Sequence, residues 1–325
     1  MALSLMISIC MLLLSPVSDG SFTVMFWNLE NFFDWKDSGY SSSDHEFSAS
    51  GERRWTRGRF YAKCNAVSKT VLWTGSRYGS LPDIICFAEV ENAFVLKSIA
   101  YSTALKKYGY GIVHYESDDK RGIDVGLIYR KDRFRCTGSE PHKIYDENGN
   151  RLPTRDILEV TLQSLADSSL KVAVLVNHHP SKYGGEKISV PRRKSAMYAL
   201  AHISDSLERN GYENIVAAGD FNDTPDGPAM DILDGILYDL SYGLHMAGKG
   251  TIRYRGKWEL IDLMFVSEKL EKVSRMEICT VPFLLADDSS AAGKKPLRTY
   301  SGPRYIGGVS DHLPIMGFFK PDRQN

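Results

Sequence analysis

One pattern constrains this chain more than any other: short apolar segments end directly in acidic, amide or histidine residues. The segments are rich in β-branched and aromatic residues, which predicts strands. Several are apolar throughout, which indicates a sheet covered on both faces. Polar groups at strand ends are typical of binding and catalytic sites, because a sheet holds their backbone rigidly. The predicted strands are 22–27, 84–88, 125–129, 157–162, 172–176, 215–218 and 263–266.

Stretches with helical spacing lie between these strands, so the chain is expected to be an α/β protein. They cover residues 57–72, 95–107 and 191–209. Two polar segments, 37–54 and 285–308, are long enough to be functional loops or locally disordered. No repeat, low-complexity run or Pro/Ser-rich linker divides the sequence, and residues 21–325 are therefore expected to form a single domain.

The start of the chain has the character of an export signal. Residues 1–14 are almost wholly apolar and uncharged, but this stretch is too short to span a bilayer comfortably. It fits the hydrophobic region of a signal peptide, and the small residues Ser18 and Gly20 favour cleavage after Gly20. Residues 1–20 are therefore predicted to be a signal peptide of a secreted, periplasmic or envelope protein. Because no Lys or Arg precedes the apolar run, a buried N-terminal helix is the alternative.

Charge and cysteine content narrow the class of protein. Forty basic and forty acidic side chains give a formal net charge of zero, so no overall basic field would attract nucleic acid. A local basic cleft is still compatible with this balance. The spacing of Cys64, Cys86, Cys136 and Cys279 matches no CxxC metal pattern and indicates no disulfide framework. We expect a monomer without a stable protein partner and without a transmembrane span.

The first three strand ends carry carboxylate or amide groups. Asn28 and Glu30 follow the opening strand and would be ordinary turn residues if they stood alone. Glu89 ends the apolar strand 84–88, where a carboxylate is costly unless it is paired or bound to a metal. Asp124 interrupts an otherwise apolar strand and needs a partner for the same reason.

Histidines follow the strand 172–176. A lone histidine is usually structural, but His178 and His179 stand together beside an asparagine and a proline. Further on, Asp220 and Asn222 are two residues apart and point to the same side of their strand end. A carboxylate and an amide in this arrangement can hold a water nucleophile and a phosphoryl oxygen together.

The last polar groups lie towards the C-terminus. Asp262 directly precedes the strand 263–266, and Asp311 and His312 are adjacent. An adjacent Asp-His pair can supply a metal-binding carboxylate and a base from one loop.

In this order the motifs resemble the endonuclease/exonuclease/phosphatase superfamily, over about residues 24–318. The segments Gly219-Asp220-Phe221-Asn222 and Ser310-Asp311-His312 are the most specific, and Asn28 and Glu89 gain specificity from them. The resemblance implies a DNase I-like α/β fold: a four-layer sandwich of two packed, mainly antiparallel or mixed β-sheets flanked by helices. It also implies metal-dependent hydrolysis of a phosphodiester.

The same resemblance assigns the metal ligands. Glu89 is the main ligand, Asn28 lies beside it, Asp311 completes the acidic site, and Glu30 joins through a water. Such hard oxygen ligands suit Mg²⁺, with Mn²⁺ as the alternative.

The catalytic roles are implied in the same way. His312 activates water or stabilises the attacked phosphate, and Asp262 orients its ring. Asp220 positions the attacking water, Asn222 donates to a phosphate oxygen, and His178 lies near the leaving group.

The roles of three further residues are left open. The doubled histidine leaves His179 as an alternative to His178, and Asp124 could orient His178. Arg121 could contact phosphate, although a helix-capping or surface ion-pair role fits as well.

A basic segment, residues 53–59, carries four arginines around Trp55. Basic groups interleaved with an aromatic can hold a phosphate backbone and stack a base, so Arg54 and Arg57 are predicted to bind substrate. A solvated helix start is the alternative.

These features predict a nuclease or phosphodiesterase acting on nucleic acid. The alternative is a phosphatase or phospholipase C-like hydrolase of inositol phosphates, sphingomyelin or another small phosphate ester. A non-catalytic binding protein on the same fold is disfavoured, because every catalytic position holds the expected residue type. Loops choose the substrate on a shared fold, so the strand ends alone do not decide between these esters.

Overall fold

The computed structural model describes residues 20–39, 41–182 and 184–321. Apart from Gly20, the predicted signal peptide lies outside the described residues. Within the described part of the chain, no helix has the length and apolar character needed to cross a membrane.

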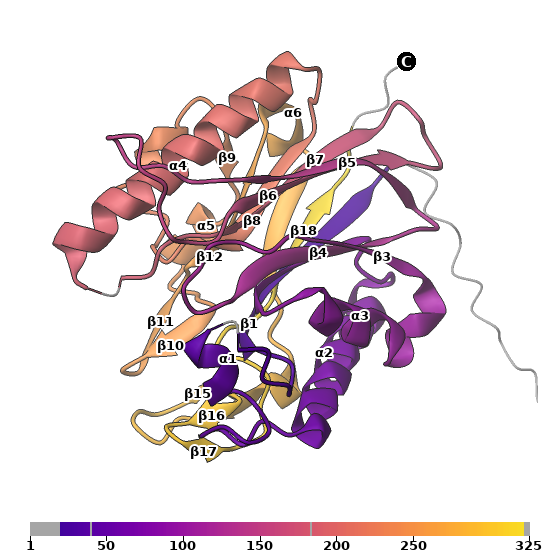
Figure 1. Ribbon diagram of the computed structural model, residues 1–325. Coiled ribbons are helices and arrows are strands. Elements are labelled where there is room, and N and C mark those ends of the chain that lie inside the picture. Colours follow the sequence, from indigo (N-terminus) through magenta and orange to yellow (C-terminus); the bar gives the residue numbers. More distant parts are fainter. Residues whose placement is uncertain (1–19, 40, 183, 322–325) are drawn as a thin grey trace, which may run out of the picture.

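Two six-stranded sheets pack face to face at the centre of the molecule (Figure 1). Each is mixed, since β1 pairs in parallel with β2 and β7 with β8, while the other neighbours are antiparallel. The first sheet has the order β13 (Ser274–Ile278), β18 (Ile315–Phe319), β1 (Phe22–Phe32), β2 (Ile84–Val90), β4 (Asp124–Arg130), β3 (Tyr110–His114). The second has the order β5 (Phe134–His142), β6 (Ile157–Ser164), β7 (Lys171–His178), β8 (Ile215–Asp220), β12 (Asp262–Val266), β9 (Tyr238–Asp239).

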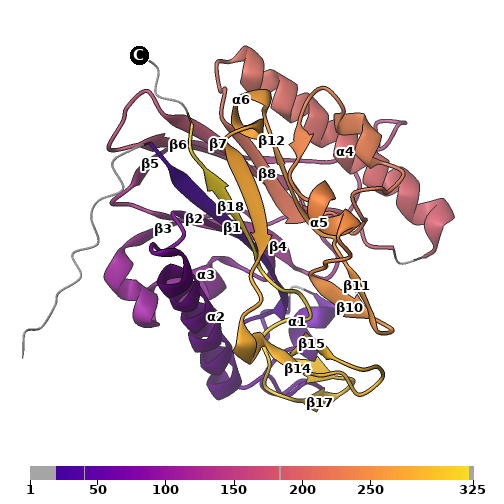
Figure 2. The same ribbon diagram turned by 180° about the vertical axis from the view of Figure 1, so that it is seen from behind.

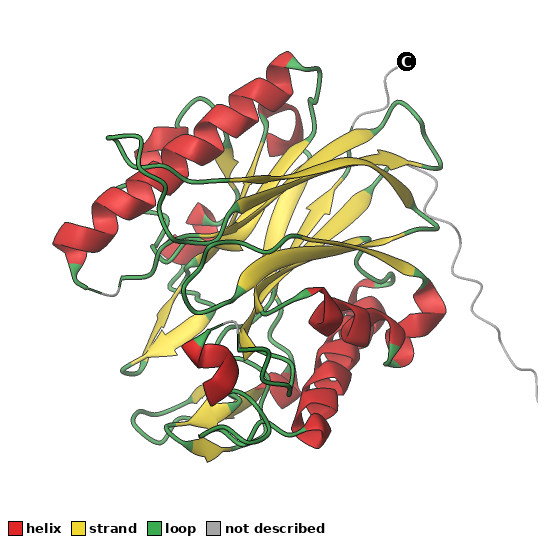
Figure 3. Cartoon of the chain, viewed as in Figure 1, coloured by secondary structure: helices red, strands yellow, loops and turns green. Residues whose placement is uncertain are grey.

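Helices cover both outer faces, so the layers run helix, sheet, sheet, helix (Figure 3). On one side lie α2 (Arg57–Tyr78) and α3 (Ala93–Tyr101), and on the other lies α4 (Glu186–Arg209), as the reverse view in Figure 2 also shows. This arrangement confirms the predicted four-layer α/β sandwich. The short helical elements are α1 (Ser42–Glu46), η1 (Ala104–Tyr108), η2 (Met230–Leu233), α5 (Tyr242–Met246), α6 (Glu268–Glu271) and η3 (Pro282–Leu284).

Strand β1 is apolar on both faces because each face packs into a different hydrophobic core. Phe22, Val24 and Phe26 lie in the core that the two sheets share. Met25 and Trp27, which point the other way, lie in the second core with the inner face of α2. Because both faces of the strand meet an apolar core, its sequence does not alternate between apolar and polar.

The strand directions bring the polar strand ends to one place. Parallel pairing places the C-terminal ends of β1 and β2 together, and the same holds for β7 and β8. Strand β12 runs antiparallel to β8, so its first residue, Asp262, stands opposite Asp220. The turn before β18 adds Asp311 and His312.

Several element boundaries differ from the sequence prediction. The helix predicted over 95–107 is two elements, because α3 ends at Tyr101 and η1 begins at Ala104. Helix α4 begins before Pro191, which lies in its second turn rather than at its start. The segment 37–54 contains α1. The segment 285–308 forms hairpins rather than a structureless loop: β14 (Leu285–Asp287) with β15 (Lys294–Pro296), and β16 (Tyr300–Ser301) with β17 (Arg304–Tyr305).

Strands were also missed by the sequence prediction: β3, β5, β13, β18 and β9, and the hairpin of β10 (Ile252–Tyr254) with β11 (Lys257–Glu259). Strand β5 is largely solvent-exposed and polar, so its composition does not distinguish it from a loop. The described cysteines are free thiols.

Candidate active site

Irregular backbone at the strand ends sets the direction in which the predicted site residues project. The pairing of β1 with β2 shifts between Asn28 and Phe32, where Glu30 and Asn31 have φ values of 48° and 46°. The pairing of β2 with β4 shifts at Glu89, whose φ is 59°. Left-handed backbone is uncommon in residues other than glycine and collects at functional sites. These bulges turn the side chains away from the regular strand alternation.

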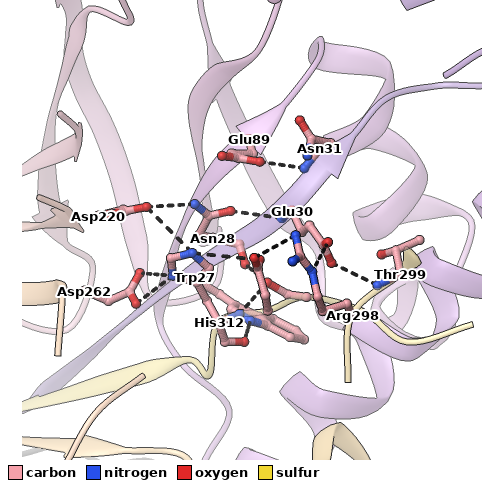
Figure 4. A network of polar contacts seen from close by, with 12 residues as sticks. Trp27, Asn28, Glu30, Asn31, Glu89, Asp220, Asp262, Arg298, Thr299 and His312 are labelled. Carbon is pink, nitrogen blue, oxygen red and sulfur yellow. Dashed lines mark hydrogen bonds and ion pairs between the residues drawn. The ribbon is translucent and has the colours of Figure 1, made fainter. Parts of the chain in front are cut away.

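Asp220 contacts both Asn28 and His312 in the network of polar contacts (Figure 4). Asn28 donates from Nδ2 to Asp220 Oδ2 at 2.9 Å, and the backbone N–H of Asn222 donates to Asp220 Oδ1 at 2.9 Å. Gly219 precedes it because a Cβ there would lie 2.4 Å from the backbone oxygen of Asn177. Burial raises the pKa of Asp220 to about 7, although the neighbouring His312 opposes this shift.

Asp262 orients His312. Its Oδ2 lies 2.8 Å from Nδ1 of His312, and the His312 Nε2 faces Asp220 Oδ2 at 3.9 Å. Burial alone would lower the pKa of His312, but the carboxylates of Asp262, Asp220 and Asp311 raise it well above 6.5. The imidazole of His312 is therefore cationic at neutral pH.

His178 faces Asp220 from the other side. Its Nε2 lies 3.7 Å from Asp220 Oδ2 and 3.8 Å from Glu89 Oε1. Burial, with the positive charges of Arg155 and Arg121, lowers the pKa of His178 well below 6.5. The carboxyl group of Asp220 thus lies between an imidazole whose pKa is lowered and one whose pKa is raised.

The structure separates the two adjacent histidines. The ring of His179 packs against Phe221 at 4.6 Å between ring centroids, and its Nε2 lies 3.3 Å from Asn177 Oδ1. The backbone oxygen of His179 accepts from Asn222 Nδ2 at 2.9 Å. His178 therefore lies with the predicted site carboxylates, whereas His179 supports the turn beside them.

Arg155 is a buried residue that holds this turn and that the sequence reasoning missed. Its guanidinium donates to the backbone oxygens of His178 and His179 at 3.2 Å and 2.7 Å. It also pairs with Asp119 Oδ2 at 2.9 Å. Its position in a loop after several polar residues gives no signal of this role.

Glu30 and Asp311 are joined by Arg298, which the sequence reasoning also missed. Its Nε lies 2.8 Å from Glu30 Oε1, and a terminal nitrogen lies 3.0 Å from Asp311 Oδ2. Glu30 also accepts from the backbone N–H of Thr299 at 2.9 Å. Burial and the negative charge of Asp311 raise the pKa of Glu30 to about 7.

Lys63 supports the same corner from helix α2. Its Nζ donates to the backbone oxygen of Glu30 at 2.8 Å and to Thr299 Oγ1 at 2.9 Å. Burial lowers the pKa of Lys63 to about 8. A signal existed in the sequence, because Lys63 falls on the face of the helix that carries Phe60 and Val67.

Glu89 and Asn28 are the oxygen donors that the sequence predicts as metal ligands. Glu89 Oε2 accepts from the backbone N–H of Asn31 at 2.7 Å, while Oε1 lies 3.7 Å from an Arg121 nitrogen. Asn28 Oδ1 accepts from the N–H of Glu30 at 2.9 Å. These hard oxygen donors lie in an acidic setting, in which burial disfavours the charged forms of Glu30 and Asp220. Such a donor set fits a divalent cation.

Asp220, Asp262 and His312 also have ligand atoms within 4.8 Å of one another. Both Asp262 oxygens lie within 3.1 Å of His312 Nδ1, so this imidazole and carboxylate already satisfy each other. We therefore interpret the trio as an oriented histidine beside a carboxylate rather than as the metal centre.

Asp124 does not orient His178 as the sequence suggested. Its Oδ1 accepts from the backbone N–H of Ser117 at 3.0 Å, and its Oδ2 lies 3.6 Å from His114 Nε2. The start of β4 directs this carboxylate towards the end of β3, whereas His178 instead faces Glu89 and Asp220.

The basic segment 53–59 is partly committed to the protein itself. Trp55 is buried and donates to the backbone oxygen of Phe33 at 2.8 Å, so it cannot stack on a base. The Arg57 guanidinium lies over the rings of Trp35 and Tyr61, although the residue is exposed. Arg54 is exposed and has a φ of 46°.

A hollow of about 230 Å³ adjoins this segment and the acidic corner. Its lining residues are Glu30, Asn31, Phe47, Arg53, Arg298, Thr299, Tyr300 and Gly302. A second hollow of about 350 Å³, lined in part by Leu170, Gly211 and Pro321, contains none of the predicted site residues. Of these two hollows, only the smaller one is lined by a predicted site residue, Glu30.

Comparison with solved structures shows what the fold is similar to. An endonuclease/exonuclease/phosphatase family protein from Bacteroides thetaiotaomicron has a TM-score of 0.60 at 18% identity, over 94% of this chain and 99% of that one. A mannosyl-6-phosphatase from the same organism has a TM-score of 0.58 at 17% sequence identity, over 92% of this chain and 99% of that one. The human Nocturnin catalytic domain with bound sulfate has a TM-score of 0.56 at 16% sequence identity, over 93% of this chain and 95% of that one. A comparison with curated protein sequences gives no match.

The sequence itself matches the family model described as endonuclease/exonuclease/phosphatase family over residues 23–320. That span includes each predicted catalytic and metal-binding residue. Members of this family hydrolyse phosphate esters and generally use divalent metals. This chain, with its strand-end carboxylates and histidines, belongs to the endonuclease/exonuclease/phosphatase family.

Proposed function

We propose that this protein hydrolyses a phosphate ester in a metal-dependent reaction centred on Asp220. The observation that carries the proposal is the position of Asp220 Oδ2, 3.7 Å from His178 Nε2 and 3.9 Å from His312 Nε2. Titratable groups whose environments push their pKa values apart are typical of acid–base chemistry. Here one imidazole is neutral and the other is cationic.

Asn28 and Glu89 would hold the divalent cation, Mg²⁺ or Mn²⁺, with Asp311 and Glu30 adding negative charge nearby. When bound, such a cation offsets the charge of the phosphoryl oxygens. Arg298 already pairs with Glu30 and Asp311, so these two carboxylates are better suited to acting through Arg298 or a water than as direct ligands.

The chain's own residues supply the remaining chemistry. Asp220 is placed to accept a hydrogen bond from the attacking water, because Asn28 and Asn222 already hold its two oxygens from the protein side. The His312 imidazolium, held by Asp262, stabilises negative charge on the phosphoryl group. Neutral His178 can donate a hydrogen bond to the phosphate or near the leaving group.

A small phosphate ester is the substrate that the surroundings favour. The hollow of about 230 Å³ beside Glu30 has the polar and aromatic lining that a compact organic group needs. Arg121 and Arg298, whose side chains are 42% and 51% exposed, both lie beside site carboxylates. Each of these guanidinium groups can pair with the oxygens of a terminal phosphate. The structurally similar mannosyl-6-phosphatase is consistent with this choice.

A nucleic acid strand is the second candidate. The observation that favours it is the exposure of Arg54 and Arg57 on the segment that also lines the hollow through Arg53. The buried Trp55 removes the aromatic platform that the sequence suggested.

The experiment is a substrate panel with purified protein and Mg²⁺ or Mn²⁺. It contains sugar phosphates, inositol phosphates, sphingomyelin, single-stranded and duplex DNA, abasic DNA and RNA. We expect the highest kcat/KM on a small ester, and loss of that activity in His312→Ala. Predominant cleavage of DNA or RNA would replace the first candidate with the second. No hydrolysis of any panel member with either metal would count against the proposal as a whole.

We also propose that the protein is exported, because residues 1–14 are apolar and uncharged and small residues precede Ser21. Intact-mass measurement of the protein from its native host is the test. A mature chain that begins near Ser21 supports export, and a retained segment 1–20 on cytoplasmic protein contradicts it.

A further inference from the structure

A second group of potential metal ligands lies outside the residues that the proposed reaction uses. His114 ends β3, Asp124 begins β4, and Glu116 lies in the segment that connects the two strands. One ligand atom from each of these side chains lies within 4.8 Å of the others. Antiparallel pairing of β3 with β4 keeps His114 and Asp124 close without any contribution from the connecting segment.

The imidazole of His114 is the unusual member of this group. Its side chain is only 3% exposed, and its Nε2 atom is buried without a hydrogen-bond partner. Its nearest charged neighbours are Asp124 Oδ2, 3.6 Å from Nε2, and Glu116 Oε1, 3.9 Å from Nδ1. Buried polar atoms normally have a partner, and leaving one unpaired destabilises the folded state.

The two carboxylates approach the ring at different nitrogens, Asp124 at Nε2 and Glu116 at Nδ1. Asp124 Oδ1 is held by the backbone N–H and the hydroxyl of Ser117, which leaves Oδ2 facing His114. The Glu116 side chain is 56% exposed, so its carboxylate is free to turn towards Nε2 and join Asp124 there.

The protonation states point the same way. Burial lowers the pKa of His114 to about 4, so its ring is neutral and has a lone pair available. Burial raises the pKa of Asp124 to about 8, and Glu116 contributes by its negative charge. A carboxyl that holds a proton beside a neutral imidazole can exchange that proton for a metal ion.

We propose that His114, Glu116 and Asp124 bind a divalent transition ion, Zn²⁺ or Mn²⁺, at a site separate from the one at Asn28 and Glu89. One imidazole nitrogen and two carboxylate oxygens form a mixed donor set that these ions accept, with water completing the coordination. The proton that leaves the Glu116–Asp124 pair goes to solvent as the ion binds.

The ion would fix the segment 115–123 at both ends. That segment carries Arg121, which lies 3.7 Å from Glu89, and Asp119, which pairs with the buried Arg155 that holds the His178 turn. The second site is thus a structural one, whose occupancy steadies residues next to the reaction.

The test counts ions per chain by native mass spectrometry after stripping the protein and adding Zn²⁺ or Mn²⁺ alone. Wild type should bind one ion more than His114→Gln and one more than Glu116→Gln. His142→Gln is the matched control, because His142 Nε2 already pairs with Glu159 at 2.8 Å and should not hold an ion. The same comparison in a Glu89→Ala background separates this site from the active-site metal.

The exposed Glu116 makes its variant a mild one that retains the fold, so a result does not depend on His114→Gln folding. Thermal unfolding supplies a second readout: added Zn²⁺ should raise the Tm of Glu89→Ala but not of Glu89→Ala/Glu116→Gln. Equal ion counts and equal Tm shifts in these two proteins would overturn the second site, whatever the outcome for hydrolysis.

Discussion

Asp262 holds His312 by a contact of 2.8 Å between Oδ2 and Nδ1, and this contact directs the other ring nitrogen of His312 towards Asp220. Asp262 is fully buried, and it opens a strand whose partner β8 ends in Asp220. The orientation of the imidazole is therefore a consequence of sheet pairing. Because β12 holds Asp262 against the ring, this carboxylate should determine the charge state of His312.

The first prediction is that Asp262→Asn lowers the pKa of His312. The amide keeps the shape of the side chain but removes its charge, so Asp220 and Asp311 alone then oppose the effect of burial on the ring. Titration of the His312 ring signals by NMR should show the change. The ring signals of His142 and His202 should not move, and an unchanged His312 titration would show that Asp262 does not control this group.

The same variant should alter how stability depends on pH. His312 has a folded pKa above the unfolded value of about 6.5, so its contribution is fully present below that pH and is lost as pH rises through the folded pKa. The difference in free energy of unfolding between wild type and Asp262→Asn should thus be larger near pH 6 than at strongly alkaline pH. Urea unfolding at both pH values measures it. A difference that does not depend on pH would contradict the assignment.

The second prediction concerns Glu89. Excess chelator should abolish hydrolysis, Mg²⁺ or Mn²⁺ should restore it, and Glu89→Ala should lower kcat/KM by about 100-fold or more, a loss of roughly 3 kcal/mol of transition-state stabilisation. Glu91→Gln is the matched control, because that side chain accepts from the N–H of Asp34 at 2.6 Å rather than facing the site. Full activity in chelator, or similar losses in the two variants, would remove Glu89 from the metal site.

The site residues that were easiest to predict from the sequence are carboxylates in apolar strands, because burying an unpaired carboxylate is costly. Glu89 and Asp220 interrupt or end apolar strands, where an unpaired carboxylate is expensive, and that signal is local. The choice between His178 and His179 required the structure, because adjacent residues face opposite sides and only one can face Asp220. The fold class was predictable from strand composition and family resemblance. The exposed strand β5 was not, because its residues are largely polar.

Arg298 joins the site from far along the chain and was not predictable. Arg298 contacts Glu30 across 268 positions, and it lies in a polar segment where an arginine is unremarkable. The Asp124 prediction was wrong for a related reason. A polar residue in a strand indicates that a partner exists but does not say which one, and pairing with β3 supplied His114.

The third prediction is that Lys63→Met destabilises the corner at Glu30. The methionine keeps the apolar stem in the core but leaves the backbone oxygen of Glu30 and the hydroxyl of Thr299 without their donor. Unsatisfied buried groups of this kind cost about 1–3 kcal/mol. Urea unfolding should show that loss. Lys69→Met, which changes a lysine on the same helix that lies over the Phe283 ring, should cost less, and equal effects would indicate that the Lys63 hydrogen bonds contribute nothing specific.

The fourth prediction separates the two candidate substrates through Arg54 and Arg57. Each arginine that neutralises a backbone phosphate should change the slope of log K against log salt by about one. If a nucleic acid strand runs over this segment, Arg54→Ala and Arg57→Ala should raise KM for DNA and flatten its salt dependence. A small phosphate ester needs only the residues around Asp220, so its kcat/KM should barely change in either variant.

The proposed preference for a small ester predicts a definite outcome of this comparison. DNA cleavage should be weak at every salt concentration and have the same slope in wild type, Arg54→Ala and Arg57→Ala, because the Arg57 guanidinium lies over Trp35 and Tyr61. Arg298→Gln should in contrast lower kcat/KM for the small ester, since it removes the cation between Glu30 and Asp311. Its effect should appear in KM if Arg298 binds the phosphate, and in kcat if it only keeps the two carboxylates in place. A salt slope that flattens in the two segment variants, with Arg298→Gln leaving ester hydrolysis intact, would instead favour the nucleic acid strand.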